Sequence, residues 1–183
     1  MTQGYLIAVV GPSGVGKDSV MAGIKAVLPD VHIVKRTVTR PPGMEGEEYI
    51  SASPETFWQM IENKDFSVHW HAHELYYGIP ASVQRDLDAG IDCFANFSRS
   101  ALATGAAAFP NFCVLNVTAD PNTLANRLRE RGRETDTQIK SRLAQASKPL
   151  PPGLSVIEVQ NEGALDTTVQ TAIAHLRKMG VQL

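Results

Sequence analysis

The segment GPSGVGKDSV (11–20) carries residue types that bind polyphosphate. Glycines at 11, 14 and 16 followed by Lys17 match the phosphate-binding pattern G-x-x-x-x-G-K-[ST] up to its last position. Successive backbone N–H groups of such a loop and the N-terminus of the next helix form an anion nest. The lysine then reaches the β- and γ-phosphates. A glycine-rich turn without a ligand is the alternative, but such a turn has no need of Lys17.

The loop departs from the pattern at Asp18, where a hydroxyl residue usually helps to hold Mg²⁺. Two interpretations stay open. Asp18 is either an acid in the first turn of a helix, favoured by the dipole, or a direct or water-mediated Mg²⁺ contact. Ser19 is a poor replacement for the hydroxyl because one step along a helix rotates the side chain by about 100°.

Arginines are concentrated in RLRERGRE (127–134), and Arg142 follows on the next predicted helix. Arg127 and Arg131 are four residues apart and share a helical face. Arginines on a mobile helix pair can close on a transferring phosphoryl group, neutralise its charge and exclude water. The alternative is a solvated charged helix with Glu130 and Glu134 as partners.

Two arginines of KRTVTR, Arg36 and Arg40, precede Glu47, Glu48 and Tyr49 by a few residues. A pair of nearby arginines suits a phosphate-bearing acceptor, although basic loops are common.

Three histidines alternate in HWHAHELYYG, at positions 69, 71 and 73. On a single strand they would face one way, as in a zinc site or the polar wall of a pocket. No fourth ligand or catalytic glutamate is evident. Tyr76 and Tyr77 could donate to a phosphate or a sugar, or simply pack.

Strand and helix patterns alternate along the chain. The expected strands are 5–10, 32–35, 66–78, 91–97, 112–120 and 154–159, and the expected helices are 19–28, 53–62, 80–90, 120–132, 135–146 and 164–180. This alternation predicts an α/β fold with a parallel sheet and helices on both faces. The glycine loop lies where such sheets bind phosphate, and the aromatic insert at about 36–80 would form a lobe over that edge.

Composition is that of an ordinary globular domain: 183 residues, 43% apolar and 20% charged. The net charge of −2 gives no basic field for nucleic acid. Cys93 and Cys113 lie in apolar runs, which predicts buried free thiols in a reducing compartment. The start is not a signal peptide and no run is long enough to span a membrane, so we expect a cytoplasmic protein with no membrane partner.

Taken together, these segments resemble the guanylate kinase family of P-loop kinases. The resemblance runs through the glycine loop, VTRPPG, the aromatic lobe with YYG, and RLRERGRE…RLAQA, and it covers most of the chain. It implies a P-loop NTPase fold with a five-stranded parallel sheet, an acceptor-binding lobe and an Arg-rich lid. The whole chain, 1–183, would be one kinase domain, with its core at 1–35 and 81–183, its lobe at about 36–80 and its lid at about 127–142.

Three departures from the family pattern concern the acceptor. Gly43 replaces a second arginine after T-R-x-P, Val68 replaces the glutamate that reads the guanine edge, and ANFSRS replaces an acidic L-D-I-D-like stretch. A site built to hydrogen-bond a base loses orders of magnitude in kcat/KM for that base when its hydrogen-bond partners are missing. We therefore expect the base pocket to be absent and the phosphate-binding groups to remain.

The segments GPSGVGKDS, TVTRP, WHAHELYYGIP, ANFSRS, RLRERGRE and NEGAL are similar to one branch of this family, whose acceptor is ribose 1,5-bisphosphate. The resemblance implies ATP-dependent formation of 5-phosphoribosyl 1-diphosphate and a link to phosphonate breakdown. The nucleophile would be a phosphate oxyanion, so the reaction needs positioning and charge neutralisation but no general base.

The expected site has three parts. The ATP- and Mg²⁺-binding loop comprises Gly11, Pro12, Ser13, Gly14, Val15, Gly16, Lys17, Asp18 and Ser19, with Asp18 at the metal. The catalytic groups are Lys17, Arg127, Arg131, Arg133 and Arg142. The acceptor site comprises Arg36, Arg40, Glu47, Tyr49, Tyr77, Asn96, Ser98 and Arg99. Residues 161–163 would lie near the adenine.

Three alternatives remain at this level. The chain could be a guanylate kinase acting on GMP, a kinase of another small phosphorylated or sugar acceptor, or a non-catalytic interaction module of the same fold. Lys17 and the lid arginines argue against the last. The oligomeric state stays open, a dimer included.

Overall fold

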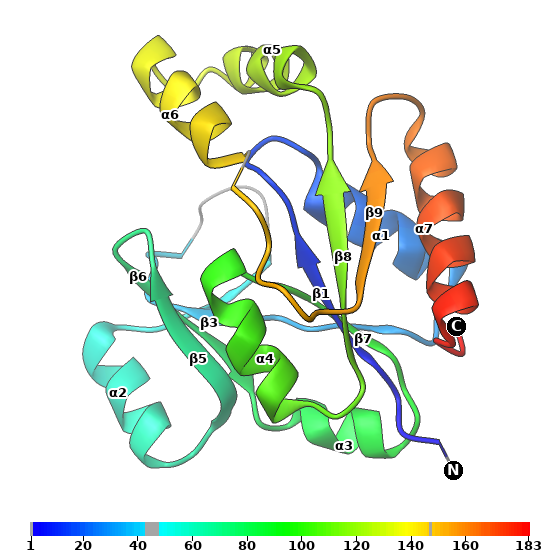
Figure 1. Ribbon diagram of the computed structural model, residues 1–183. Coiled ribbons are helices and arrows are strands. Elements are labelled where there is room, and N and C mark those ends of the chain that lie inside the picture. The colour runs from blue at the N-terminus through cyan, green and yellow to red at the C-terminus, as the bar shows by residue number, and fades with distance from the viewer. Residues whose placement is uncertain (1, 43–47, 147) are drawn as a thin grey trace.

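A five-stranded parallel sheet forms the main body of the protein in the computed structural model, which describes residues 2–42, 48–146 and 148–183 (Figure 1). Every neighbouring pair in this sheet runs parallel. In spatial order the strands are β2 (His32–Ile33), β7 (Cys93–Asn96), β1 (Leu6–Val10), β8 (Phe112–Thr118) and β9 (Val156–Gln160). The sheet predicted from the sequence is thereby confirmed.

Helices cover both faces of this sheet. On one face lie α1 (Lys17–Val27) and α7 (Leu165–Met179), which pack against each other and share a core with the sheet (Figure 1). On the other face lie α3 (Val83–Asp88), the short 3₁₀ turn η1 (Arg99–Ala101) and α4 (Leu102–Ala108). The central strand β1 is buried along its whole length, as its unbroken apolar sequence requires.

A second, four-stranded sheet forms a lobe beside the main body. Its strands are β4 (Ile50–Ser51), β3 (Thr37–Val38), β6 (Leu75–Pro80) and β5 (Phe66–Ala72), in that order, with α2 (Pro54–Glu62) packed on them. The expectation of one strand over 66–78 is wrong, because the chain reverses at His73 and Glu74, both with positive φ. His73 therefore lies in the turn, and the strand face shared by three histidines does not form.

The helix pair α5 (Pro121–Arg131) and α6 (Asp136–Ala146) lies above the carboxyl ends of the main strands (Figure 1). Asp120 caps α5 by accepting hydrogen bonds from the backbone N–H groups of Asn122 and Thr123, at 2.8 and 3.1 Å. The hydrogen bonds from Thr123 lower the pKa of the Asp120 carboxyl. Gly132 ends the helix with φ of 68°.

Both cysteines are free and buried, in agreement with their apolar sequence context. Within the described ranges, no helix has the length and apolar character needed to cross a bilayer.

Candidate active site

The glycine loop joins β1 to α1, and α1 begins at Lys17, so the helix N-terminus is directed at the loop. Gly14 and Gly16 have φ of 83° and 91°, which favours glycine. A Cβ atom at Gly11 would lie 2.4 Å from the carbonyl oxygen of Val117, so a side chain has no room there. The loop therefore has the backbone geometry of an anion nest.

The ammonium group of Lys17 folds back over this loop. Its Nζ donates hydrogen bonds to the carbonyl oxygens of Gly11, at 3.0 Å, and Pro12, at 3.3 Å. The positive charge and the helix N-terminus thus converge on the same side of the loop.

Asp18 lies beside the carboxyl end of β7. The Nδ2 of Asn96 donates a 2.8 Å hydrogen bond to Asp18 Oδ1. Asn96 is only 4% exposed, and its buried Oδ1 has no hydrogen-bond partner among the described residues. Carboxylate and amide oxygens are ligands that Mg²⁺ prefers, so this pair fits the metal assigned to Asp18 from the sequence. Asn96 was expected at the acceptor, and its contact with Asp18 favours the metal side of the site instead.

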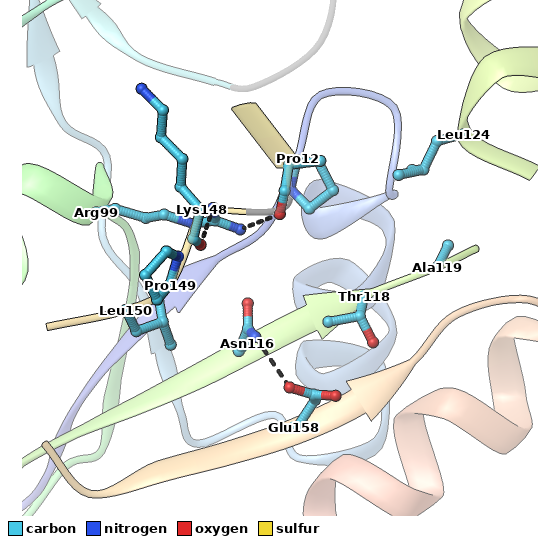
Figure 2. Close-up of a pocket in the computed structure, with 11 residues that line it drawn as sticks. Pro12, Arg99, Asn116, Thr118, Ala119, Leu124, Lys148, Pro149, Leu150 and Glu158 are labelled. Carbon is cyan, nitrogen blue, oxygen red and sulfur yellow. Dashed lines mark hydrogen bonds between the residues drawn. The ribbon is translucent and has the colours of Figure 1, made fainter. Parts of the chain in front are cut away.

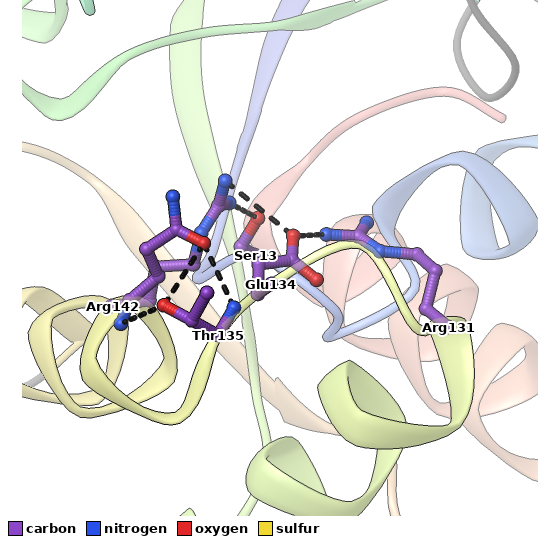
Figure 3. Close-up of polar contacts among 6 residues, drawn as sticks. Ser13, Arg131, Glu134, Thr135 and Arg142 are labelled. Carbon is purple, nitrogen blue, oxygen red and sulfur yellow. Dashed lines mark hydrogen bonds and ion pairs between the residues drawn. The ribbon is translucent and has the colours of Figure 1, made fainter.

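A buried carboxylate connects two of the arginines of the lid. Glu134 Oε1 accepts a hydrogen bond from Arg131 and lies 3.5 Å from the Nη2 of Arg142, while the Nη1 of Arg142 contacts Ser13 Oγ in the glycine loop (Figure 3). The Glu134 side chain is 4% exposed, and its Oε2 has no partner within the described chain. Arg131 and Arg142 keep exposed side chains, at 36% and 43%, so the alternative of a solvated charged segment with Glu134 as a partner stays open beside the catalytic interpretation. Arg133 lies in the connection between α5 and α6.

Replacing Glu134 by glutamine is expected to lower the turnover rate by roughly 10- to 100-fold, because misplaced catalytic groups lose rate steeply. The amide keeps the size of the side chain but removes the charge that pairs Arg131 with Arg142. Michaelis constants should change far less than the rate, and Glu134→Asp should recover part of the rate. Glu130→Gln, at an exposed position of α5, is the matched control, and equal losses in both variants would contradict a positioning role.

Arg127 lies at the other side of the lid against backbone carbonyls. Its guanidinium donates to the carbonyl oxygens of Asn161, at 2.7 Å, and Val15, at 3.3 Å. Asn161 is itself buried, donating to the Val15 carbonyl and accepting from the Thr168 hydroxyl. These contacts join α5, the glycine loop and the segment after β9. They favour a structural role for Arg127 over direct contact with a phosphate.

Arg99 also binds main-chain oxygens. It donates to the carbonyls of Gln145, Ala146 and Lys148, at 3.0, 3.0 and 2.6 Å, at the C-terminal end of α6. Burial lowers the pKa of this guanidinium. A cation at this end of a helix complements the dipole, so the contacts favour a capping role over the acceptor contact expected from the sequence.

The residues expected at the acceptor lie mainly in the lobe. The Arg36 guanidinium, in a residue only 7% exposed, stacks over the rings of Tyr77, at 4.9 Å, and Trp70, at 5.8 Å. Trp70 donates a 2.9 Å hydrogen bond to Ser98 Oγ, two residues after Asn96. A continuous chain of contacts thus leads from Arg36 to the strand end that carries Asn96.

Arg40 lies over the ring of Tyr49, at 5.4 Å, and the Tyr49 hydroxyl donates to the Pro41 carbonyl, at 2.5 Å. Val68 is buried in the core between the lobe and the main sheet, where it offers no polar group to a base. Two positions singled out from the sequence, Gly43 and Glu47, lie outside the described residues.

A cavity of 420 Å³ adjoins the glycine loop at Pro12 (Figure 2). Asn116 and Glu158 from β8 and β9 lie at one side, and Arg99, Lys148, Pro149 and Leu150 at the other. Lys17 and Asp18 do not line it, so it lies beside the phosphate cradle. Asn116 Oδ1 is buried and has no partner in the described part of the chain. Sequence reasoning missed this residue, although a polar side chain in the buried strand FCVLNVT was a visible signal.

Comparison with known proteins places these features in a family. The family model described as guanylate kinase matches residues 3–178. A ribose 1,5-bisphosphate phosphokinase PhnN of Ruegeria sp. (strain TM1040) is 43% identical over 94% of this chain and 91% of its own length. The protein of that name from Rhizobium etli (strain CIAT 652) is also 43% identical, over 95% of this chain and 90% of its own.

Solved structures agree at the level of the fold. A guanylate kinase from Anaplasma phagocytophilum superposes with a TM-score of 0.68 at 16% identity, covering 99% of this chain and 88% of that one. From its match over nearly the whole length, its glycine loop and its sheet order, the chain belongs to the guanylate kinase family.

Proposed function

We propose that this protein transfers the γ-phosphoryl group of ATP to ribose 1,5-bisphosphate, forming 5-phosphoribosyl 1-diphosphate and ADP during phosphonate breakdown. The observation that carries the proposal is the acceptor side, where Arg36 stacks on Tyr77 and Trp70 while Val68 is buried. The lobe thus holds a guanidinium against aromatic rings beside the acceptor region, and valine stands where the family has its base-reading glutamate. The names of the relatives from Ruegeria and Rhizobium support the same acceptor.

The reaction follows from how the charged groups are placed. An oxygen of the sugar 1-phosphate attacks the γ-phosphorus, and the bond to the β–γ bridging oxygen breaks as ADP leaves. The attacking oxygen is already an anion, so no residue has to remove a proton. Lys17 and the loop N–H groups hold the β- and γ-phosphates, while Arg131 and Arg142 neutralise the migrating group. Arg36 and Arg40 hold the acceptor.

The proposed cofactor is Mg²⁺, held by Asp18 with Asn96 beside it. When bound, the ion would supply positive charge to the phosphate oxygens. Asp18 then takes the place of the hydroxyl that the loop pattern lacks, and its own charge would otherwise repel the nucleotide. The protein side of this arrangement is the hydrogen bond that orients the Asp18 carboxylate.

The Asp18→Asn variant is expected to need about 10- to 100-fold more Mg²⁺ for half-maximal binding of a fluorescent ATP analogue. The amide keeps its size but loses the charge that attracts the ion. Asp18→Thr restores the usual hydroxyl and should recover much of the affinity. Asp30→Asn is the matched control, since this carboxylate is exposed and lies after the end of α1, outside the glycine loop. If the Mg²⁺ dependence is unchanged in Asp18→Asn, Asp18 does not contact the metal and is only an acid that complements the dipole in the first turn of α1.

Acceptor identity is tested by ADP release with Mg-ATP and, in parallel, ribose 1,5-bisphosphate, ribose 5-phosphate and GMP. Turnover with ribose 1,5-bisphosphate is expected to exceed that with GMP by at least about 10⁴-fold in kcat/KM, because the base has lost its polar partners. Efficient turnover of GMP would instead make the chain a guanylate kinase and overturn the argument from Val68. Turnover of ribose 5-phosphate alone would indicate a kinase of another sugar acceptor.

A further inference from the structure

Three side chains that take no part in the proposed reaction converge at one edge of the main sheet. His32 lies on the edge strand β2, Cys93 on the adjacent β7, and Asp86 on α3. Their ligand atoms, one nitrogen, one sulfur and one oxygen, all lie within 4.8 Å of one another. His32 Nδ1 and Asp86 Oδ2 lie 2.6 Å apart.

The fold holds these three positions in a fixed arrangement. His32 and Cys93 are aligned in register on neighbouring parallel strands, so their side chains project from the same face. The helix α3 packs on that face through Val83 and Leu87, which share a core with Cys93.

Backbone hydrogen bonds fix each position further. The His32 N–H donates to the Asp92 carbonyl, at 2.9 Å, and the Cys93 N–H to the Tyr5 carbonyl, at 2.8 Å. The Asp86 carbonyl accepts from the N–H of Ile91, at 2.9 Å. The backbone at all three positions is thus hydrogen-bonded within the fold, which helps to preorganise the three side chains.

The chemistry of the cluster is that of a thiophilic divalent ion. Imidazole nitrogen, thiolate sulfur and carboxylate oxygen are the ligands of zinc, at about 2.0 to 2.3 Å from the ion, which places tetrahedral ligand atoms about 3.4 Å apart. The side chains of His32 and Asp86 are 44% and 35% exposed, so an ion can enter and these two groups can separate slightly. Cys93 is fully buried and forms the floor.

The surrounding charge also favours a cation. The carboxylates of Asp86 and Asp92 lie close enough to the Cys93 thiol to act on it electrostatically. The same negative charges that oppose a free thiolate attract a divalent ion. When the ion binds, the sulfur–metal bond replaces the sulfur–hydrogen bond, and the proton passes to solvent.

We propose that His32, Asp86 and Cys93 bind one zinc-like ion, with water as the fourth ligand, and that this ion fastens the two-residue edge strand β2 to α3 and β7. Cys93 begins β7 and Asn96 ends it, so the ion lies about 10 Å along the strand from the phosphate site. The proposed metal site is therefore separate from the catalytic groups. The strand β2 is followed within a few residues by Arg36 in the lobe.

The test titrates Cd²⁺ into the full chain in a thiol-free reducing buffer and follows thiolate-to-cadmium charge-transfer absorption. We expect saturation at one equivalent, loss of the signal in Cys93→Ala, and affinity reduced at least tenfold in His32→Gln and Asp86→Asn. Cys113→Ala removes the other buried thiol and is the matched control, in which the signal should persist. Zn²⁺ at a hundredfold excess over its dissociation constant should raise the melting temperature by roughly 5 to 10 °C.

Absence of a saturable charge-transfer signal in the parent chain would overturn the proposal, and so would its survival in Cys93→Ala or its loss in Cys113→Ala. The partly exposed His32 and Asp86 allow substitution without a buried cavity, so the test stands even if a cysteine variant fails to fold. Kinase turnover in His32→Gln should match the parent chain. This separates failure of the metal site from failure of the proposed function.

Discussion

Substituting Arg142 by methionine is expected to lower kcat by about 10³-fold or more, the range found for arginines that neutralise a transferring phosphoryl group. Arg142 reaches from α6 to Ser13 in the glycine loop and lies beside Glu134, so we expect its charge to act on the γ-phosphate in the proposed reaction. Methionine keeps much of the length and apolar stem but removes the charge. The Michaelis constant for ATP should change little, because the charge matters most in the transition state.

Steady-state kinetics with Mg-ATP and the best acceptor measure this effect. Arg129→Met is the matched control: Arg129 lies on the same lid, and its guanidinium contacts the Asn126 side chain, at 3.2 Å. Its kcat should remain within about twofold of the parent value. A loss smaller than tenfold in Arg142→Met would remove Arg142 from the catalytic groups and leave Arg131 as the better candidate.

Substituting Lys17 by methionine is expected to lower kcat/KM for ATP by about 10²- to 10³-fold. The ammonium group donates to two loop carbonyls, those of Gly11 and Pro12, and in the proposed reaction it would also present its charge to the phosphates. Removing it takes away both a transition-state charge and a support of the loop. Binding of ATP and turnover should therefore weaken together, unlike the effect at Arg142.

Lys25→Met provides the comparison within the same helix. Lys25 donates to the carbonyls of Pro29 and Val31, beyond the C-terminal end of α1, at 2.7 and 2.6 Å. Its replacement should reduce the free energy of unfolding by about 1 kcal/mol and leave the kinetic constants unchanged. Thermal melts and kinetics of the two variants distinguish a general effect on α1 from a specific effect on phosphate binding. Equal kinetics in both would remove Lys17 from the site.

The core of the fold followed from local sequence signals. Buried strands were visible as apolar runs, and α5 could be bounded from Asp120, Pro121 and Gly132, whose capping chemistry acts within a few residues. The hairpin between β5 and β6 was missed because its turn uses His73 and Glu74 at positive φ, where glycine or asparagine is the usual signal. The two-residue strands β3 and β4 are too short to show any alternation.

Only those parts of the site that lie within one continuous segment could be predicted from the sequence. The glycine loop is such a segment. The partners of Asp18 and Glu134 come from elsewhere in the fold, and their contacts with Asn96, Arg131 and Arg142 depend on how separate elements pack. Arg99 and Arg127 could be identified as cations, but the carbonyl groups that they bind are defined only by tertiary structure.

Two arginines fasten the helix pair to the main body: Arg127 lies in the second half of α5, and Arg99 binds the C-terminal end of α6. Arg127 ties α5 to Val15 and Asn161, and Arg99 ties the end of α6 to the 3₁₀ turn after β7. Because the helix pair is fastened at both arginines, a rotation about only one of them would break the hydrogen bonds made by the other. A rotation about the line through Arg127 and Arg99 would keep both sets of hydrogen bonds, and it would move the connection that carries Glu134 relative to the glycine loop. A shorter side chain at Arg127 or Arg99 would remove one of the two anchoring sets of hydrogen bonds. The connection that carries Glu134 would then move over a wider range.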